Sequence, residues 1–150
     1  MNVGTMPMIL TLRITLVRGR YCNGEWAANI ELDESSTLED LHHAIQEAVD
    51  FDSDHMYCFF QSRTERSGSR EYFDDENGLI FSETLMEMFP LPAKQSLFYL
   101  FDWGDNWVFK ISRTRKRPHE PVKGVAYPRM ESESGTKPVQ YPTDDEEDEE

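Results

Sequence analysis

The sequence has few cysteines, no long apolar run and a shortage of basic residues. Cys22 and Cys58 are the only two thiols among 150 residues, too few for a disulfide-stapled fold or a zinc finger. We expect both to stay reduced, as in a cytoplasmic protein. No apolar run approaches the roughly 18 residues of a membrane-spanning helix. The start, MNVGTMPMIL, has neither the basic segment nor the cleavage site of a secretory signal.

Basic residues are outnumbered: 15 Lys and Arg stand against 29 Asp and Glu, a net charge of −14. This balance argues against bulk nucleic-acid binding, which depends on cations that replace phosphate counterions. Residues 143–150 read TDDEEDEE, and such a run repels itself and buries nothing. We therefore expect a disordered acidic tail at 143–150 after a single domain at 1–142. The tail could also mask the chain's basic stretch.

Several catalytic signatures are missing. There is no GxSxG elbow, no Gly-rich phosphate loop and no pair of histidines at helical spacing with a glutamate between them. Neither cysteine has a neighbouring base in the sequence. These absences favour a protein that is not an enzyme.

Alternating apolar and polar residues, as in ILTLRITLV, predict strands. The expected strands cover residues 9–17, 25–32, 55–62 and the two arms of a hairpin within 96–113. The hairpin turn is expected at Trp103 to Asn106, with Gly104 supplying a positive φ. Residues 62–80 lack any period and are expected to be mostly loop, and the Pro-punctuated part from about 114 is expected to be irregular.

Helical spacing of apolar residues predicts one main helix over Thr37 to Val49. Ser36 and Glu39 have the spacing of a capping box at its start. A short second helix is expected over Ser82 to Phe89, ended by Pro90. The fold class is therefore α+β: a mixed sheet of about five strands, one main helix packed across it, and a β-grasp-like start.

Four segments carry a family resemblance: Trp26, the helix TLEDLHHAIQ (Thr37 to Gln46), DSDH (Asp52 to His55) and LFYLFDWGDNW (Leu97 to Trp107). Together they resemble the Ri-plasmid (pRi) ORF-like family, also described as insertion-element passenger or TnpR-like proteins. The resemblance spans roughly Leu10 to Arg113. It implies a compact bacterial α+β domain, often carried on mobile elements, with no established activity.

The chain departs from the family pattern at two places. Ala27 stands where many relatives have Arg, and VAYPRMESESG replaces a segment with Pro-Pro-Glu-Asp and Gly-Gly. The resolvase-like name also finds no support in the residues, because a serine recombinase needs several arginines around its nucleophile. The first 40 residues hold only Arg13, Arg18 and Arg20.

The stretch FDWGDNW offers candidate binding residues. Asp102 and Asp105 flank Gly104, where aspartates commonly cap the backbone of a turn, and Trp103 and Trp107 are explained by cross-strand packing. The alternative is a site. His42, His55, Asp102 and Asp105 are residue types that bind divalent metals. They are scattered in the sequence, so no cofactor is expected, and a divalent metal at these four residues is the alternative.

RTRKR is the one basic cluster, and it comprises Arg113, Arg115, Lys116 and Arg117. It is either a solvated strand end or a site for a phosphate backbone or an acidic partner.

The sequence therefore favours an uncharacterised cytoplasmic bacterial protein that works as a non-enzymatic interaction or accessory module with an unknown protein partner, linked to mobile elements. One alternative is a metal-dependent hydrolase or nuclease-like enzyme that uses the four metal-type residues. A second alternative is weak DNA binding through the basic cluster.

Overall fold

The computed structural model describes residues 7–141. Apolar residues at every second position form the centre of its sheet. Leu12 and Ile14 of β1 (Ile9–Arg18) lie opposite Ile30 and Ala28 of β2 (Trp26–Asp33), and all four are buried. Period-two alternation therefore gives both strands one face in the core, as predicted.

The sheet contains seven described strands in the order β4-β3-β5-β6-β1-β2-β7, and every pairing is antiparallel. The other five are β3 (Tyr57–Ser62), β4 (Glu71–Phe73), β5 (Ser96–Phe101), β6 (Trp107–Arg113) and β7 (Arg129–Gly135). The α+β class is confirmed. The prediction of a mixed sheet is wrong, because the chain after β2 crosses to a distant sheet position where β3 pairs antiparallel with β4 and β5. The prediction of about five strands is also wrong, because it leaves out β4 and β7.

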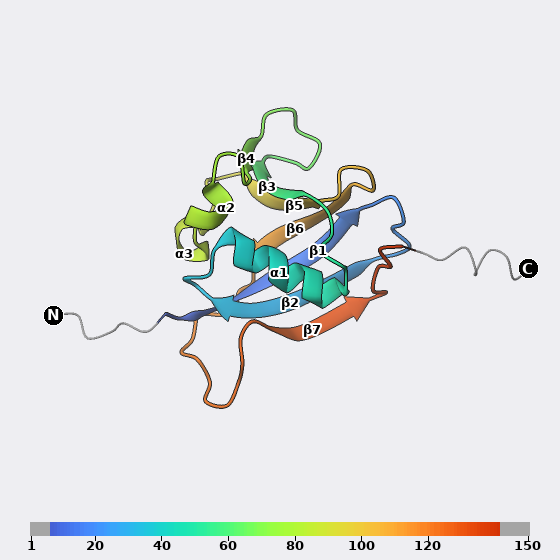
Figure 1. Cartoon of the computed structure of the whole chain (residues 1–150). Coiled ribbons are helices and arrows are strands. Elements are labelled where there is room, and N and C mark those ends of the chain that lie inside the picture. The colour runs from blue at the N-terminus through green and yellow to red at the C-terminus, as the bar shows by residue number, and fades with distance from the viewer. Residues whose placement is uncertain (1–6, 142–150) are drawn as a thin grey trace, which may run out of the picture.

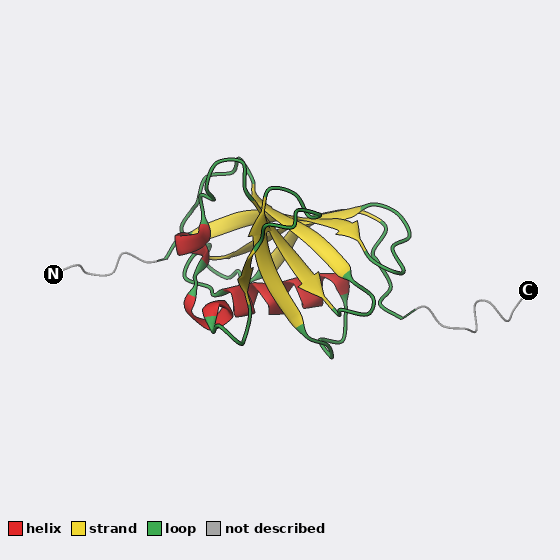
Figure 2. Ribbon diagram, turned by 90° about the horizontal axis from the view of Figure 1, so that it is seen from above, coloured by secondary structure: helices red, strands yellow, loops and turns green. Residues whose placement is uncertain are grey.

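The helices lie on one face of the sheet, with α1 (Leu38–Val49) running across it (Figures 1 and 2). Leu38, Leu41 and Ile45 of α1 are fully buried against this face. The expected short helix is α3 (Leu85–Met88), and a further short helix, α2 (Leu79–Ser82), precedes it. The chain thus has three described helices, one more than predicted.

The capping box of α1 lies one residue later than the sequence analysis placed it. Thr37 Oγ1 accepts from the Asp40 backbone N–H at 3.2 Å, and Asp40 Oδ2 accepts from the Thr37 N–H at 2.9 Å. Ser36 has another task, since its carbonyl oxygen accepts from the Leu85 N–H at 2.9 Å. The bond to Leu85 attaches α3 to the start of α1.

Two expectations concern the end of the chain. The part after 114 is not wholly irregular, because β7 pairs with β2 although its side chains are mostly exposed. The predicted acidic tail at 143–150 lies outside the described residues.

Cys22 and Cys58 are free thiols. None of the helices in 7–141 is both long and apolar enough to cross a bilayer.

Candidate functional site

A cleft of about 540 Å³ opens on the helix side of the sheet, where the chain enters β3. We call it the His55 cleft. Its wall comes from the first turn of α1, the segment before β3, the loop after β4 and α2: Glu39, Ser53, Asp54, His55, Met56, Tyr57, Asp75, Ile80 and Phe81. The volume suits one or two amino-acid side chains of a partner or a small ligand.

The lining of the cleft combines negative charge with exposed apolar surface. Glu39, Asp54 and Asp75 contribute three carboxylates. Met56 is 63% exposed and Phe81 51% exposed. Exposed apolar side chains that gather in one cleft with charged groups around them are typical of a contact surface, because monomeric proteins rarely expose large contiguous apolar patches.

His55 belongs to a polar cluster at the rim of the cleft. Its Nε2 atom lies 2.5 Å from the Tyr141 hydroxyl and 3.4 Å from Asp102 Oδ2. The Tyr141 hydroxyl donates its only proton to Asp54 Oδ2 at 3.1 Å. The bond from Nε2 to that hydroxyl therefore requires His55 to carry a proton on Nε2.

Gln140 holds the rim in place from the far end of the described chain. Its Oε1 accepts from the Asp52 N–H at 2.7 Å, and its Nε2 donates to Asp54 Oδ1 at 3.0 Å. Burial alone would raise the pKa of Asp54, but the hydrogen bonds from Gln140 and Tyr141 outweigh it and lower that pKa. Asp54 therefore stays ionised near neutral pH.

A buried network lies directly behind the cleft. The Gln46 amide donates to the Tyr99 hydroxyl at 2.9 Å, and that hydroxyl lies 2.5 Å from His42 Nδ1. The Tyr99 hydroxyl thus donates to Nδ1, and His42 is the neutral tautomer protonated on Nε2. Two cleft residues join this network: Tyr57 stacks on the His42 ring at 3.6 Å, and Ser53 donates to Gln46 through its backbone N–H.

Burial fixes the charge state of His42. The residue is only 4% exposed, and this desolvation, with a smaller contribution from neighbouring His43, lowers its pKa from 6.5 to about 3. His42 is therefore neutral throughout the physiological range. Its role is that of a hydrogen-bond acceptor under α1, and it does not present a ligand to solvent.

The FDWGDNW turn is capped as predicted. Asp102 Oδ1 accepts from the backbone N–H groups of Gly104 and Asp105 at 3.0 and 3.2 Å. The prediction of a positive φ at Gly104 is wrong, because Asp102 (66°) and Asn106 (58°) take it instead. Short side chains that bond to nearby backbone tolerate this conformation.

The two tryptophans of the turn differ completely in their surroundings. Trp103 is 50% exposed and follows Asp102 at the cleft rim, whereas Trp107 is fully buried. The Trp107 ring lies 5.1 Å from that of Phe51 and packs directly on Gly19, where an added Cβ would overlap the indole ring. Trp103 is available to a partner, and Trp107 is a core residue.

The structure does not gather the four metal-type residues predicted from the sequence. His55 and Asp102 are adjacent, but His42 bonds to Tyr99, and Asp105 faces Arg20 with 3.9 Å between Oδ1 and Nη1. Within residues 7–141, no group of three or more His, Cys, Asp or Glu side chains is placed to hold a metal ion.

The residues of the basic cluster differ in their surroundings: Lys116 forms ion pairs, and the three arginines are exposed. Lys116 Nζ lies 2.9 Å from Glu31 Oε2 and 3.0 Å from Glu131 Oε2, while Arg113, Arg115 and Arg117 are exposed.

Glu31, which the sequence analysis did not single out, is 1% exposed and also contacts Arg129 at 2.7 Å and His119 at 3.3 Å. Burial would raise the pKa of Glu31, but its bonds to Lys116, His119 and Arg129 lower it. Lys116 is thus part of a structural ion cluster.

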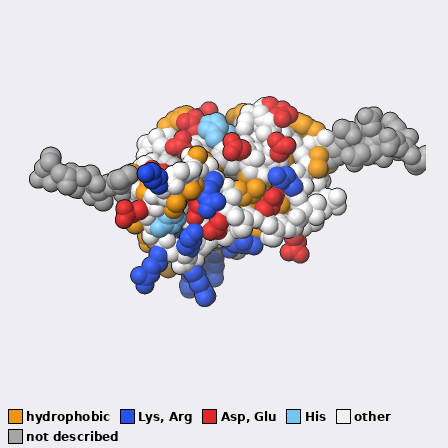
Figure 3. All heavy atoms as spheres, turned by 90° about the horizontal axis from the view of Figure 1, so that it is seen from below, with side chains coloured by type: hydrophobic (Ala, Val, Ile, Leu, Met, Phe, Trp, Pro, Cys, Tyr) orange, Lys and Arg blue, Asp and Glu red, His pale blue; other side chains and the backbone are white. Residues whose placement is uncertain are grey.

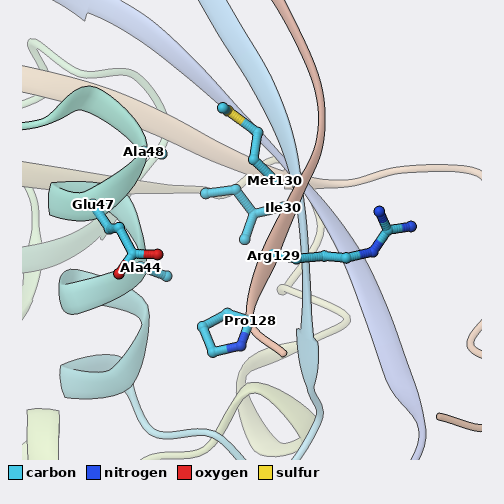
Figure 4. Close-up of a pocket in the computed structure, with 7 residues that line it drawn as sticks. All are labelled: Ile30, Ala44, Glu47, Ala48, Pro128, Arg129 and Met130. Atoms are coloured by element: carbon cyan, nitrogen blue, oxygen red, sulfur yellow. The ribbon is translucent and has the colours of Figure 1, made fainter. Parts of the chain in front are cut away.

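A small cavity of about 90 Å³ separates α1 from β7 (Figure 4). Ala44, Ala48 and Glu47 face it from α1, and Ile30 and Met130 face it from the sheet. Arg129 turns away from this cavity in the same view, in agreement with its bond to Glu31. The cavity has room for only a few water-sized groups, so we do not consider it a ligand site.

The family description "Plasmid pRiA4b ORF-3-like protein" matches residues 9–140. The chain belongs to this family. The match includes the resemblance drawn from the sequence and extends it past β7 to Gln140, so the Pro-punctuated part is within the family domain. No curated protein sequence matches the chain.

Among solved structures, the chain is similar to a crystal structure described as "Protein of Unknown Function MM3350 from Methanosarcina mazei Go1". The two share 24% sequence identity with a TM-score of 0.67, over 86% of this chain and 71% of that one. This likeness supports the fold and says nothing about activity.

Proposed function

We propose that the protein is a non-enzymatic interaction module whose protein partner inserts a Lys or Arg side chain into the His55 cleft. One observation carries the proposal: the cleft combines the carboxylates of Glu39, Asp54 and Asp75 with the exposed apolar side chains of Met56 and Phe81. A cationic head with an aliphatic stem matches both parts of this lining.

One more exposed aromatic residue contacts His55, and another is the chain neighbour of a residue that contacts His55. Trp103 follows Asp102, which contacts His55, and Tyr141 is 43% exposed with its hydroxyl on His55. Tryptophan, tyrosine and methionine are the residue types that contribute most to contact surfaces between proteins. The partner segment is therefore expected to carry an apolar residue beside its Lys or Arg.

The enzyme hypothesis has less support from the geometry. A hydrolase using His42, His55, Asp102 and Asp105 would need His42 to reach the cleft, but its Nδ1 is occupied by Tyr99 beneath α1. Asp102 already uses Oδ1 to cap its turn. What is left is the His55–Asp102 pair, and it lies at the rim of the cleft.

The proposal also covers the genetic and cellular location of the protein. The family takes its name from a plasmid reading frame, and we place the partner among proteins encoded on mobile elements in bacteria. A cytoplasmic location suits the free thiols of Cys22 and Cys58.

Binding to an array of short peptides tests the proposal. Each peptide contains Arg or Lys beside Leu, Phe or Trp. Its matched control replaces Arg with citrulline or Lys with acetyl-lysine. The protein should bind a subset of the cationic peptides, and neutralising the cation should weaken binding by about tenfold or more. Glu39→Gln and Asp75→Asn should reproduce that loss, because neither carboxylate has an ion-pair partner among the described residues.

Phe81→Ala should weaken binding of the same peptides, while Glu120→Gln, an exposed carboxylate outside the cleft, serves as the charge-matched control. Equal binding of cationic and neutralised peptides would refute the proposal. So would an equal effect of Glu120→Gln and Asp75→Asn.

A further inference from the structure

The face of the sheet that points away from α1 is covered at both ends and open in the middle. Over β3 and β5, the loop 63–70 shields Phe60, with the Arg70 guanidinium 4.1 Å from the ring centre. Over the start of β1, segment 114–119 is tied to Thr11 and Ile9 by backbone bonds. Polar side chains of β1, β2 and β6 occupy the strip between these covers.

Two exposed cations stand on this open strip. Arg13 of β1 lies opposite Ser112 of β6, and Lys110 of β6 lies opposite Thr15 of β1. This diagonal register places the two residues about 7–8 Å apart on one face. Arg13 is also oriented, because its Nη1 donates to Asn29 Oδ1 at 3.3 Å.

The strip leads into a hollow of about 350 Å³ at the β1–β2–β7 end of the face. Arg13, Thr15 and Ser134 contribute a guanidinium and two hydroxyls to its lining, and Glu25 is its one carboxylate. A guanidinium flanked by hydroxyl donors suits an oxyanion such as a phosphate group.

More cations continue the surface at its other end. Arg113, Arg115 and Arg117 are exposed, and, like Arg13 and Lys110, they have no ion-pair partner within residues 7–141. Lys and Arg side chains gather in the lower half of the view from below, while most Asp and Glu side chains lie above them (Figure 3). On the side seen in this view, cations therefore outnumber carboxylates in the lower half despite the overall acidity.

We propose that this outer face, with Arg13 and Lys110 at its centre, binds the phosphodiester backbone of a single-stranded nucleic acid. Within residues 7–141 this face is built from strands, and none of the described helices lies on it to enter a duplex groove. On this face Phe60 and Phe98 are buried and cannot stack on bases, and the exposed Tyr72 lies on the edge strand β4, with β3, β5 and β6 between it and Arg13. Binding therefore relies on phosphate contacts, is insensitive to base sequence and weakens steeply with salt. It involves neither His55 nor the cleft.

Fluorescence anisotropy of the full chain with a labelled oligouridine strand of about 16 nucleotides tests this inference. Wild-type protein should bind at about 50 mM salt and lose affinity as salt rises. Arg13→Gln and Lys110→Gln should each weaken binding several-fold and reduce the slope of log affinity against log salt by about 0.7. Lys94→Gln, an exposed cation before β5, is the matched control and should leave both quantities unchanged.

Three results would overturn the inference. One is an absence of binding at low salt by a wild-type protein whose thermal unfolding shows it to be folded. Another is an effect of Lys94→Gln as large as that of Arg13→Gln. The third is tighter binding of a poly-glutamate peptide than of the oligonucleotide, which would assign the surface to an acidic protein segment. Variants that unfold at the wild-type temperature ensure that a loss of binding is not a loss of fold.

Discussion

Replacing His42 with asparagine tests whether the network behind the cleft holds a neutral imidazole. The carboxamide oxygen of the introduced side chain can accept the Tyr99 hydroxyl in place of Nδ1, but it cannot take up a proton. The variant should be less stable than wild type at neutral pH, because a smaller side chain leaves space under α1. The informative quantity is how stability changes with pH.

The sign and size of that change follow from the pKa of His42. In the folded chain burial lowers it to about 3, against 6.5 without burial. The unfolded chain therefore binds a proton between these values, so stability is fully present above the unfolded pKa and is lost as pH falls. Between about pH 7 and pH 5, linkage predicts a loss of about 2 kcal/mol from this one residue.

Urea unfolding followed by tryptophan fluorescence at several pH values measures the effect. Wild type should lose about 2 kcal/mol more than the His42→Asn variant between about pH 7 and pH 5. The range lies above the pKa values of Asp54 and Glu31, both of which are lowered, so those carboxylates contribute little to the difference. His43→Gln, on the exposed side of α1, is the matched control for loss of an imidazole from this helix. Parallel curves for wild type and His42→Asn would refute the argument.

Three further predictions concern the hydroxyl of Tyr99, the contact of Gly19 with Trp107, and metal binding. Tyr99→Phe should cost about 2–4 kcal/mol, because His42 and Gln46 lose their partner in a buried site. Tyr57→Phe is the control, because the Tyr57 hydroxyl has no hydrogen-bond partner within residues 7–141. Gly19→Ala should lower the melting temperature by about 3–10 °C through the clash with Trp107, whereas Gly68→Ala, with nothing within 4 Å, should not; equal effects would contradict the contact. Adding Zn, Mn, Mg or Ca to metal-stripped protein should move the melting temperature by less than about 2 °C; a saturable rise of about 5–10 °C, abolished by Asp105→Asn, would restore the metal hypothesis.

The sequence predicted the elements that bury one face. β1, β2 and α1 repeat apolar residues at a period of 2 or 3.6, because each has one face in the common core. β3 and β5 carry continuous apolar runs, because Phe60 and Phe98 are also buried in a second cluster. β4 and β7 carry no such signal. β4 has three residues, and β7 is an edge strand held by backbone pairing to β2 with its side chains largely in water.

The cap of α1 shows why local rules fail by one residue. Ser36–Glu39 and Thr37–Asp40 both have the capping-box spacing. The choice between them is made by tertiary contacts, since Leu38 is fully buried and the Ser36 carbonyl binds Leu85. Neither contact can be read from the helix segment alone.

The candidate site was found only in part for a similar reason. DSDH and FDWGDNW pointed to His55 and Asp102, which do meet. Gln140 and Tyr141 complete the cluster from 86 to 88 positions away, in a stretch with no periodic pattern. No rule of spacing connects residues that far apart, and composition marks neither of them as functional.

The two proposed surfaces lie on opposite faces of the sheet, so variants in them should act independently. In a chain carrying both Asp75→Asn and Arg13→Gln, the loss of basic-peptide binding should equal that of Asp75→Asn alone, and the loss of oligonucleotide binding that of Arg13→Gln alone. At about 0.15 M salt the Debye length is about 8 Å, so the charges of Asp75 and Arg13 on opposite faces hardly influence each other. At about 0.01 M salt the screening length grows to about 30 Å, and Asp75→Asn should then tighten oligonucleotide binding slightly. Coupling above about 0.5 kcal/mol at the higher salt would mean that the two ligands share one surface.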